Sequence, residues 1–155
     1  MSLPKIAPGI TTEWRRFDQL SAAALYEMLR FRQQIFVVEQ RSPYLDLDDF
    51  DQSAHHLLLR IEGALSGYLR LMPPADREAA VRIGRVAVAA GLRRQGLGRS
   101  LMTEALSFCR ERYSGHAIGL NAQCHLVGFY RSFGFIEFGA PLDDGGILHI
   151  EMRRD

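Results

Sequence analysis

Hydrophobic positions along the chain repeat with two different periods, which predict strands in some segments and helices in others. Residues 10–17 have the pattern of a first strand, and Asp18 or Ser21 can cap a helix that runs to about Phe36. The positions that recur there at three- and four-residue steps are Leu25, Met28, Leu29, Arg32 and Phe36. All but Arg32 are apolar, so we expect one side of this helix to pack on the core.

Two strands joined by a tight turn are predicted next. They cover residues 56–62 and 64–72, and Gly63 lies between them, which favours antiparallel pairing. A further strand pattern covers residues 81–88 and ends before Gly91. Two or three antiparallel strands are therefore expected in this part of the chain.

The second half of the chain alternates helices with short strands. Residues 97–113 have one apolar helical side, residues 117–120 are a short apolar run, and residues 126–133 return to a helical pattern. Residues 135–138 and 147–152 are typical of a closing hairpin. This order predicts an α/β fold in which helices pack around one mixed sheet.

Length and composition favour one globular domain over residues 1–155. With 155 residues, 47% of them apolar, the chain is expected to bury roughly 70% of the surface that its extended form exposes. Its 19 Lys and Arg against 18 Asp and Glu leave a net charge of +1. That balance gives no overall field for nucleic acid or an anionic membrane, so neither is expected as a partner.

The expected location is the cytoplasm. The longest apolar runs fall far short of the ~20 residues that cross a bilayer, and residues 1–9 lack the apolar stretch of a signal peptide. Two cysteines, Cys109 and Cys124, cannot build a disulfide framework. The His and Cys residues have no zinc-site spacing, so no metal is expected.

A glycine-rich turn between a strand and a helix carries the clearest chemical signal. Residues 93–102 read Arg-Arg-Gln-Gly-Leu-Gly-Arg-Ser-Leu-Met. The first amides of a helix have no intrahelical acceptor, and the helix dipole adds partial positive charge, so a phosphate is stabilised there. Gly96 and Gly98 let a ligand approach the backbone, and the arginines add charge. The turn fits a pyrophosphate, although the same residues also suit a solvated turn without a ligand.

Two other phosphate motifs do not match this turn. The sequence contains no G-x-x-x-x-G-K-[ST], and Gly96-Leu-Gly-Arg-Ser-Leu101 lacks the third glycine of the dinucleotide fingerprint. A nucleoside-triphosphate site and an NAD site are therefore both disfavoured.

Two motifs resemble those of the GNAT acyltransferases. Arg93-x-x-Gly96-x-Gly98 matches the family's acetyl-CoA signature, R/Q-x-x-G-x-G/A, in full. Within residues 123–135, the run Phe129-Tyr-Arg-Ser-Phe-Gly-Phe135 resembles the family's late helix, which ends in Leu-Tyr-x-x-x-Gly-Phe. Residues 31–40 and 45–51 are further similar to the ElaA subgroup. The resemblance covers most of the chain, and both motifs stand in the family's order.

The resemblance implies a GNAT-like fold with acetyl-CoA as its cofactor. The fourth and fifth strands, here residues 83–89 and 116–120, would splay apart, and pantetheine would lie between them. Many relatives carry an Asn near the start of the late helix where this chain has Gln123, so either Asn121 or Gln123 can supply the amide. The implied cofactor contacts are Val86, Ala87, Val88, Arg93, Arg94, Gln95, Gly96, Leu97, Gly98, Arg99, Ser100, Asn121, Gln123 and Phe129.

Amine acetylation also needs a general acid and a base. Tyr130 aligns with the family's general acid and can protonate the departing sulfur, although its helical spacing with Phe129 also fits a core aromatic. A strand N–H near Val88 can stabilise the oxyanion. An alkylammonium has a pKa of about 10.4, so a group must remove its proton. Glu39 is the predicted base or substrate carboxylate, and an ordinary exposed acid is an equal alternative.

Other polar groups have less specific signals. Residues 41–53 are expected to be a loop. Its carboxylates can attract a cationic substrate or simply face solvent, and they lack the Gly and Glu of a calcium loop. His55 and His56 open a strand, so one is expected to point inward, and either can act as a base or hydrogen-bond a loop. The loop carboxylates are Asp46, Asp48, Asp49 and Asp51.

The sequence therefore predicts an acetyl-CoA-dependent N-acyltransferase that moves an acetyl group directly to a primary amine in a ternary complex. The alternative is an acyl-CoA-binding sensor or assembly module without transfer activity, because the cofactor turn and the chemistry are separable. The acceptor can be a small molecule or a peptide amine. A homodimer is left open.

Overall fold

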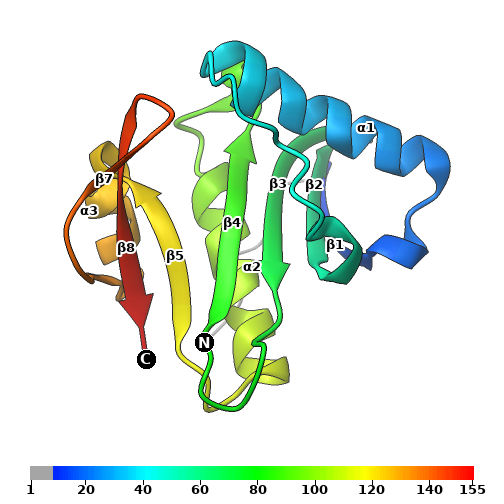
Figure 1. Cartoon of the computed structure of the whole chain (residues 1–155). Coiled ribbons are helices and arrows are strands. Elements are labelled where there is room, and N and C mark those ends of the chain that lie inside the picture. The colour runs from blue at the N-terminus through cyan, green and yellow to red at the C-terminus, as the bar shows by residue number, and fades with distance from the viewer. Residues whose placement is uncertain (1–8) are drawn as a thin grey trace.

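The alternating segments form one mixed sheet of eight strands in the computed structural model, which describes residues 9–155 (Figure 1). The order is β1-β2-β3-β4-β5-β8-β6, and β7 also pairs with β8. The expectation that the chain has no signal peptide concerned residues 1–9. Residues 1–8 of that segment lie outside the described part of the chain. The strands are β1 Ile10–Arg16, β2 His55–Ile61, β3 Ala64–Met72, β4 Val81–Val88, β5 Ile118–Gln123, β6 Ile136–Glu137, β7 Leu142–Asp144 and β8 Ile147–Arg154.

Helices cover both faces of this sheet. Because successive strand residues point to opposite faces, Leu57 packs with Leu101 of α2, whereas Leu58 and Tyr68 pack with Met28 of α1. The α3 helix lies on the same side as α2. The helical elements are η1 Phe17–Gln19, α1 Ala22–Arg32, the π-helix η2 Gln33–Glu39, η3 Asp51–Ser53, η4 Ala90–Leu92, α2 Leu97–Arg112, η5 Cys124–Leu126 and α3 Val127–Arg131.

The two central parallel strands separate after a short stretch of pairing. Strands β4 and β5 pair only from Val81 to Ile83 and from Ile118 to Leu120. A register shift in the β3–β4 ladder places an extra residue near Arg85, whose φ is +52°, and such a bulge bends the strand that carries it. The strands therefore splay toward their carboxyl ends, at the top of Figure 1, as expected for the fourth and fifth strands.

Three element boundaries differ from the sequence-based expectation. The first helix is α-helical only to Arg32 and continues as a π-helix through Glu39. Gln123 is the last residue of β5, so the late helix does not begin there but at Val127. The predicted closing hairpin is a three-stranded arrangement, because β6 and β7 both pair with β8.

Of the two predicted caps of the first helix, Ser21 is the one that the structure shows. It supplies the N-cap of α1 by accepting the Ala24 amide at 3.1 Å.

A buried ionic cluster fixes the loop 41–53 to the sheet. Arg32 is fully buried, and its guanidinium donates to Asp51 at 2.7 Å and to Asp46 at 2.9 Å. Arg70 of β3 donates to Asp51 at 3.0 Å and to Asp48 at 2.6 Å. These five residues, which we call the ionic cluster, hold a loop that has little regular structure of its own.

The ionic cluster explains one polar residue on the core side of α1 and corrects one expectation about the loop. Arg32 interrupts the apolar side of α1 and is nevertheless buried, because two carboxylates neutralise its charge. The loop carboxylates were expected to attract a substrate or face solvent. Three of them, Asp46, Asp48 and Asp51, are instead engaged by arginines, and Asp49 is the exposed one.

Replacing Asp51 tests the cluster. Asp51→Asn leaves two buried guanidinium groups short of a counter-charge, and removal of one partner from a buried pair typically costs about 3–5 kcal/mol. We expect a loss of that size in the free energy of unfolding, measured by urea denaturation. Asp49→Asn is the matched control in the same loop and should change that free energy by less than about 0.5 kcal/mol. Equal effects of the two substitutions would contradict the stabilising role.

The cluster also predicts a dependence of stability on pH. The hydrogen bond from Arg70 lowers the pKa of Asp48 from its usual 3.8 to about 2. A carboxyl whose pKa is lower in the folded state contributes stability above its unfolded pKa and loses it as the pH falls. Melting temperatures should therefore drop between about pH 4 and about pH 2. In Asp48→Asn this part of the drop should be smaller, and an unchanged slope would oppose the assignment.

Candidate functional site

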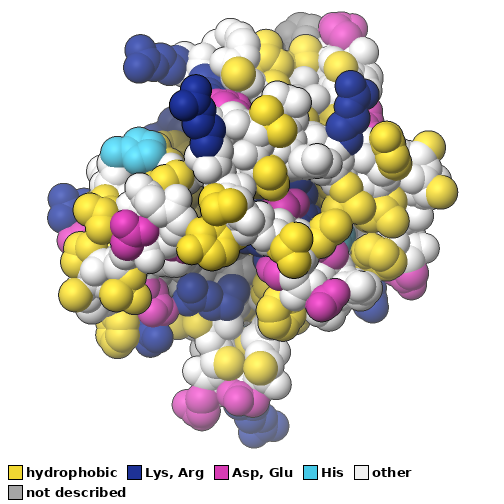
Figure 2. All heavy atoms as spheres, turned by 45° about the horizontal axis from the view of Figure 1, so that its top comes forward, with side chains coloured by type: hydrophobic (Ala, Val, Ile, Leu, Met, Phe, Trp, Pro, Cys, Tyr) yellow, Lys and Arg dark blue, Asp and Glu magenta, His cyan; other side chains and the backbone are white. Residues whose placement is uncertain are grey.

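The wedge between β4 and β5 opens into a cavity of about 350 Å³. Figure 2 turns this end of the molecule forward and shows hydrophobic side chains gathered around a hollow. The π-helix contributes Phe36 and Val37 to the wall, and the two strands contribute Val86 and Leu120. Single π-helical turns often occur at functional sites, and this one places apolar side chains in the cavity.

The glycine-rich turn follows β4 at the end where the wedge opens. Gly96 is the N-cap of the 16-residue helix α2, with φ of +83°, and Arg94 is also left-handed, with φ of +62°. Among the described residues, no hydrogen bond uses the amides of Arg94, Gln95 or Gly96. A Cβ added at Gly96 would meet nothing within 4 Å. The turn therefore presents unpaired donors in open space, which is the arrangement that binds a pyrophosphate.

Residues at the start of α2 divide between the core and the surface. Leu97 is buried in the core, so only its backbone faces the turn. A Cβ on Gly98 would lie 3.5 Å from the Phe129 ring, which shows how closely α3 approaches. Arg99 donates to Ser132 at 3.1 Å and lies over the Phe133 ring. The hydroxyl of Ser100 donates to the Gly96 carbonyl at 3.2 Å.

Arg93 links the turn to the end of the π-helix. Its Nε donates to the Val88 carbonyl at 3.1 Å, and its Nη2 donates to Glu39 Oε2 at 2.9 Å. The hydrogen bond from Arg93 lowers the pKa of Glu39, and Glu39 is outside the cavity lining. A carboxylate held ionised in this way is a weak base. The geometry favours a positioning role for Glu39, which orients Arg93 at the end of β4.

The three β4 residues that are predicted to contact the cofactor differ in their surroundings. Val86 lies beside the bulge and lines the cavity. Ala87 is buried and stands opposite Tyr68 of β3. Val88 stands opposite Gly67, and its carbonyl accepts from Arg93. On the cavity side, Val86 is therefore the most accessible of the three.

The surroundings of Tyr130 are compatible with both of the roles predicted for it. It packs against Phe129 and Phe135 and is only 7% exposed, as a core aromatic would be, and it also lines the cavity. Burial raises the pKa of its phenol to about 12. Within residues 9–155 its hydroxyl has no hydrogen-bond partner. The phenol is therefore protonated at neutral pH, as a proton donor must be.

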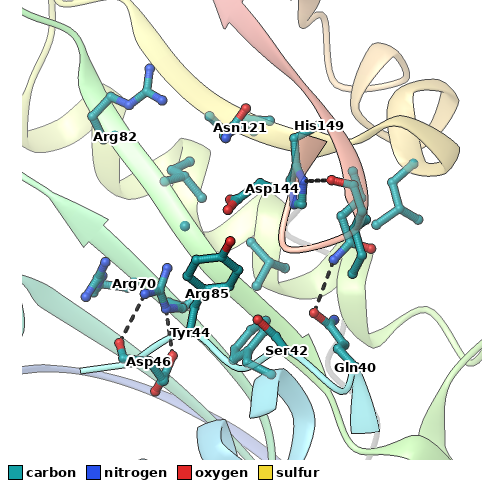
Figure 3. A pocket seen from close by; sticks show the side chains of 18 of the residues that line it. Gln40, Ser42, Tyr44, Asp46, Arg70, Arg82, Arg85, Asn121, Asp144 and His149 are labelled. Carbon is teal, nitrogen blue, oxygen red and sulfur yellow. Dashed lines mark hydrogen bonds and ion pairs between the residues drawn. The ribbon is translucent and has the colours of Figure 1, made fainter. Parts of the chain in front are cut away.

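Both candidate amides lie on β5 and line the cavity. Asn121 and Gln123 are two residues apart, so their side chains share one face of the strand. Gln123 Nε2 is 3.5 Å from Gln40 Oε1, across the wedge (Figure 3). Either amide can still supply the contact that the resemblance implies.

The two strand histidines are engaged away from the cavity. His55 Nε2 is 2.8 Å from the Tyr113 hydroxyl. His56 is buried, with Nδ1 2.6 Å from the Tyr68 hydroxyl and Nε2 2.9 Å from the Asp51 carbonyl. One of the pair points inward as expected. Both have structural partners, and neither belongs to the cavity lining.

Several cavity residues had no signal in the sequence. Figure 3 shows Ser42, Tyr44 and Arg85 on one side of the cavity, with Asp144 and His149 facing them from the β7–β8 hairpin. These residues belong to no motif. They come from loop 41–53, from β4 and from the hairpin, which are far apart in the sequence, so no local pattern groups them. Only the pairing of β8 with β5 brings the hairpin to the wedge.

Features of two other functional classes are absent from residues 9–155. None of their helices is long and apolar enough to cross a membrane, and no three His, Cys, Asp or Glu side chains converge as metal ligands. Cys109 and Cys124 are free thiols, and burial raises the pKa of Cys109 to about 11. Neither cysteine lines the cavity.

Comparison with known proteins decides the family. A family model described as an acetyltransferase (GNAT) domain matches residues 31–155. The chain belongs to the GNAT family. Like the other members of that family, it is an acyltransferase, and GNAT enzymes act on small-molecule or amine substrates.

Relatives of this GNAT chain match it over nearly its whole length. Protein ElaA of Escherichia coli is 37% identical over 147 residues, which is 92% of this chain and 96% of ElaA. The crystal structure of an acyl-CoA N-acyltransferase from Pseudomonas aeruginosa has a TM-score of 0.89 and 36% identity, and covers 94% of this chain and 99% of its own. At the level of fold alone, a GNAT acetyltransferase from Elizabethkingia anophelis with acetyl-CoA bound has a TM-score of 0.66 and 15% identity, over 94% and 95% of the two chains.

The Glu39–Arg93 contact gives a prediction that separates positioning from base catalysis. Glu39→Gln removes an exposed ion pair worth up to about 1 kcal/mol, so Kd for CoA should rise by no more than roughly fivefold, measured by calorimetry. The turnover number should change by less than about tenfold, whereas loss of a base costs about 10²–10⁴. Glu137→Gln breaks a comparable pair with Arg131 and should change neither quantity. A hundredfold loss of turnover in Glu39→Gln would restore Glu39 as the base.

Proposed function

We propose that this GNAT acyltransferase moves an acetyl group from acetyl-CoA to a primary amine by direct attack in a ternary complex. The observation that carries the proposal is the wedge itself, which has the unpaired amides of Arg94, Gln95 and Gly96 at its mouth and Tyr130 in its wall. The acetyl-CoA bound to the Elizabethkingia protein, which shares the fold, supports the choice of donor.

The residues present fit the parts of a CoA thioester. The amides from Arg93 to Arg99 lie before and within the first turn of α2, where a helix offers no intrahelical acceptor, and suit the pyrophosphate. The unpaired part of β4, near Val86, suits the amide groups of pantetheine, which can bind as an added strand would. Asn121 and Gln123 offer amides from β5, opposite that edge.

The cavity suits direct transfer. The carbon–nitrogen bond forms as the carbon–sulfur bond breaks, and the phenol of Tyr130 supplies the proton that the departing thiolate needs. A backbone N–H near Val88 is our candidate for stabilising the oxyanion. A covalent acyl-enzyme on a cysteine would require a thiol at the site, and neither Cys109 nor Cys124 lines the cavity.

A CoA-binding module without transfer activity is the second candidate. The free amides of the turn would serve it equally well, whereas the general-acid role that we propose for Tyr130 is needed only for transfer. Thermal shift with CoA tests the binding that both functions share, because a ligand of the native state raises the melting temperature. Thiol release from acetyl-CoA in the presence of amines tests transfer alone.

Tyr130→Phe separates the two candidates. The variant lacks the proton donor but keeps the ring, so we expect turnover to fall by about 10²–10⁴ while the CoA-induced thermal shift is retained. Tyr113→Phe removes a hydroxyl that contacts His55 outside the cavity, and its turnover should stay near that of the wild type. Full activity in Tyr130→Phe would rule out this tyrosine as the acid.

A further inference from the structure

One end of the cavity is built by two segments that meet across it. Tyr44 of the loop lies against the β7–β8 turn, where a Cβ on Gly145 would come within 3.0 Å of its ring. Gly145 has φ of +67°, so a side chain there would be strained as well as crowded. Asp144 and His149 flank this contact and line the cavity (Figure 3). This end is separate from the glycine-rich turn that suits the donor.

The charges at this end leave one carboxylate unpaired. Arg85 donates to Asp46 at 2.7 Å, and Arg82 donates to Glu151 at 2.8 Å, so these cavity arginines are matched by acids. The side chain of Asp144 has no hydrogen bond or ion pair within residues 9–155. A carboxylate that is free while its cationic neighbours are engaged favours a cationic ligand.

His149 has one ring nitrogen fixed and one free. Its Nδ1 lies 2.8 Å from the Ile147 carbonyl, and since a carbonyl only accepts, Nδ1 must donate. In the neutral ring Nε2 is then the acceptor, and it has no partner in the described part of the chain. His55 and His56 are engaged elsewhere and Glu39 is paired with Arg93, so His149 is the cavity group with a free basic nitrogen.

We infer that Asp144 and His149 form the acceptor end of the cavity, and that the acceptor is a primary alkylammonium. Asp144 binds the cationic amine, and His149 Nε2 removes its proton to generate the nucleophile. This inference rests on the proposed function and deepens it by naming how the acceptor is recognised and deprotonated.

The protons balance in this scheme. The ammonium gives one proton to His149, and the neutral amine attacks the thioester carbonyl. Tyr130 protonates the departing sulfur, and the second amine proton, lost as the amide forms, restores the Tyr130 phenol through solvent. His149 then releases its proton to water, so the sum is ammonium plus acetyl-CoA giving amide, CoA and one proton.

His149→Gln tests the base with two classes of acceptor. Butylamine and putrescine are protonated at neutral pH and require a base, whereas O-methylhydroxylamine is already neutral. We expect turnover to fall about 10²-fold or more with the alkylamines and less than about tenfold with O-methylhydroxylamine. In His149→Ala, added imidazole should restore part of the alkylamine rate. His116→Gln is the matched control, because His116 also contacts a backbone carbonyl through Nδ1 but lies outside the cavity lining.

Asp144→Asn tests recognition of the cation. Loss of a charged contact should raise KM for butylamine and putrescine about tenfold or more, with turnover and KM for acetyl-CoA little changed. Asp143→Asn makes the same change of charge one residue away, and its side chain can still accept the Gly146 amide, so it should leave KM unchanged.

The outcomes distinguish the inference from the proposed function. Equal losses for both classes of amine in His149→Gln, absence of imidazole rescue, or an unchanged KM in Asp144→Asn would overturn the acceptor assignment while transfer itself stands. A wild-type protein that binds CoA, seen as a thermal shift, but acetylates none of these amines would contradict the proposed function, and the acceptor assignment would fall with it.

Discussion

The site depends on incomplete pairing between two parallel strands. Strands β4 and β5 share hydrogen bonds only up to Ile83 and Leu120, and beyond that point each strand is bonded on its outer side alone. A continuous ladder would close the wedge and remove the cavity. The bulge at Arg85 turns β4 away from β5, and the backbone edge exposed there is available to a ligand that can add as a strand.

Charge then determines which segments surround the opening. The ionic cluster draws loop 41–53 onto β3, and Arg85 extends the cluster to the bulge through Asp46. At the end of β4, Arg93 connects the glycine-rich turn to Glu39. Within the ionic cluster, desolvation offsets much of the attraction between the buried charges, so the main consequence of the cluster is the placement of the loop.

The sequence predicted most elements of the fold because their signals are local. Ser21 as a cap, Gly63 between two strands and the apolar side of α2 each act within a few residues. The family motifs were local as well, and the family they indicated is confirmed. The π-helix, the start of α3 and the strand β7 were missed, because pairing and packing across the chain fix them rather than propensity.

For the candidate site, the sequence by itself located the glycine-rich turn, since a helix N-terminus is recognisable from neighbouring letters, and the resemblance to the family indicated Tyr130. The tertiary structure alone decided what faces them. It placed Glu39 on Arg93, put three loop carboxylates into ion pairs, and brought Asp144 and His149 to the cavity. The physical reason is that these contacts form between segments distant along the chain, and their partners are chosen by strand order and burial.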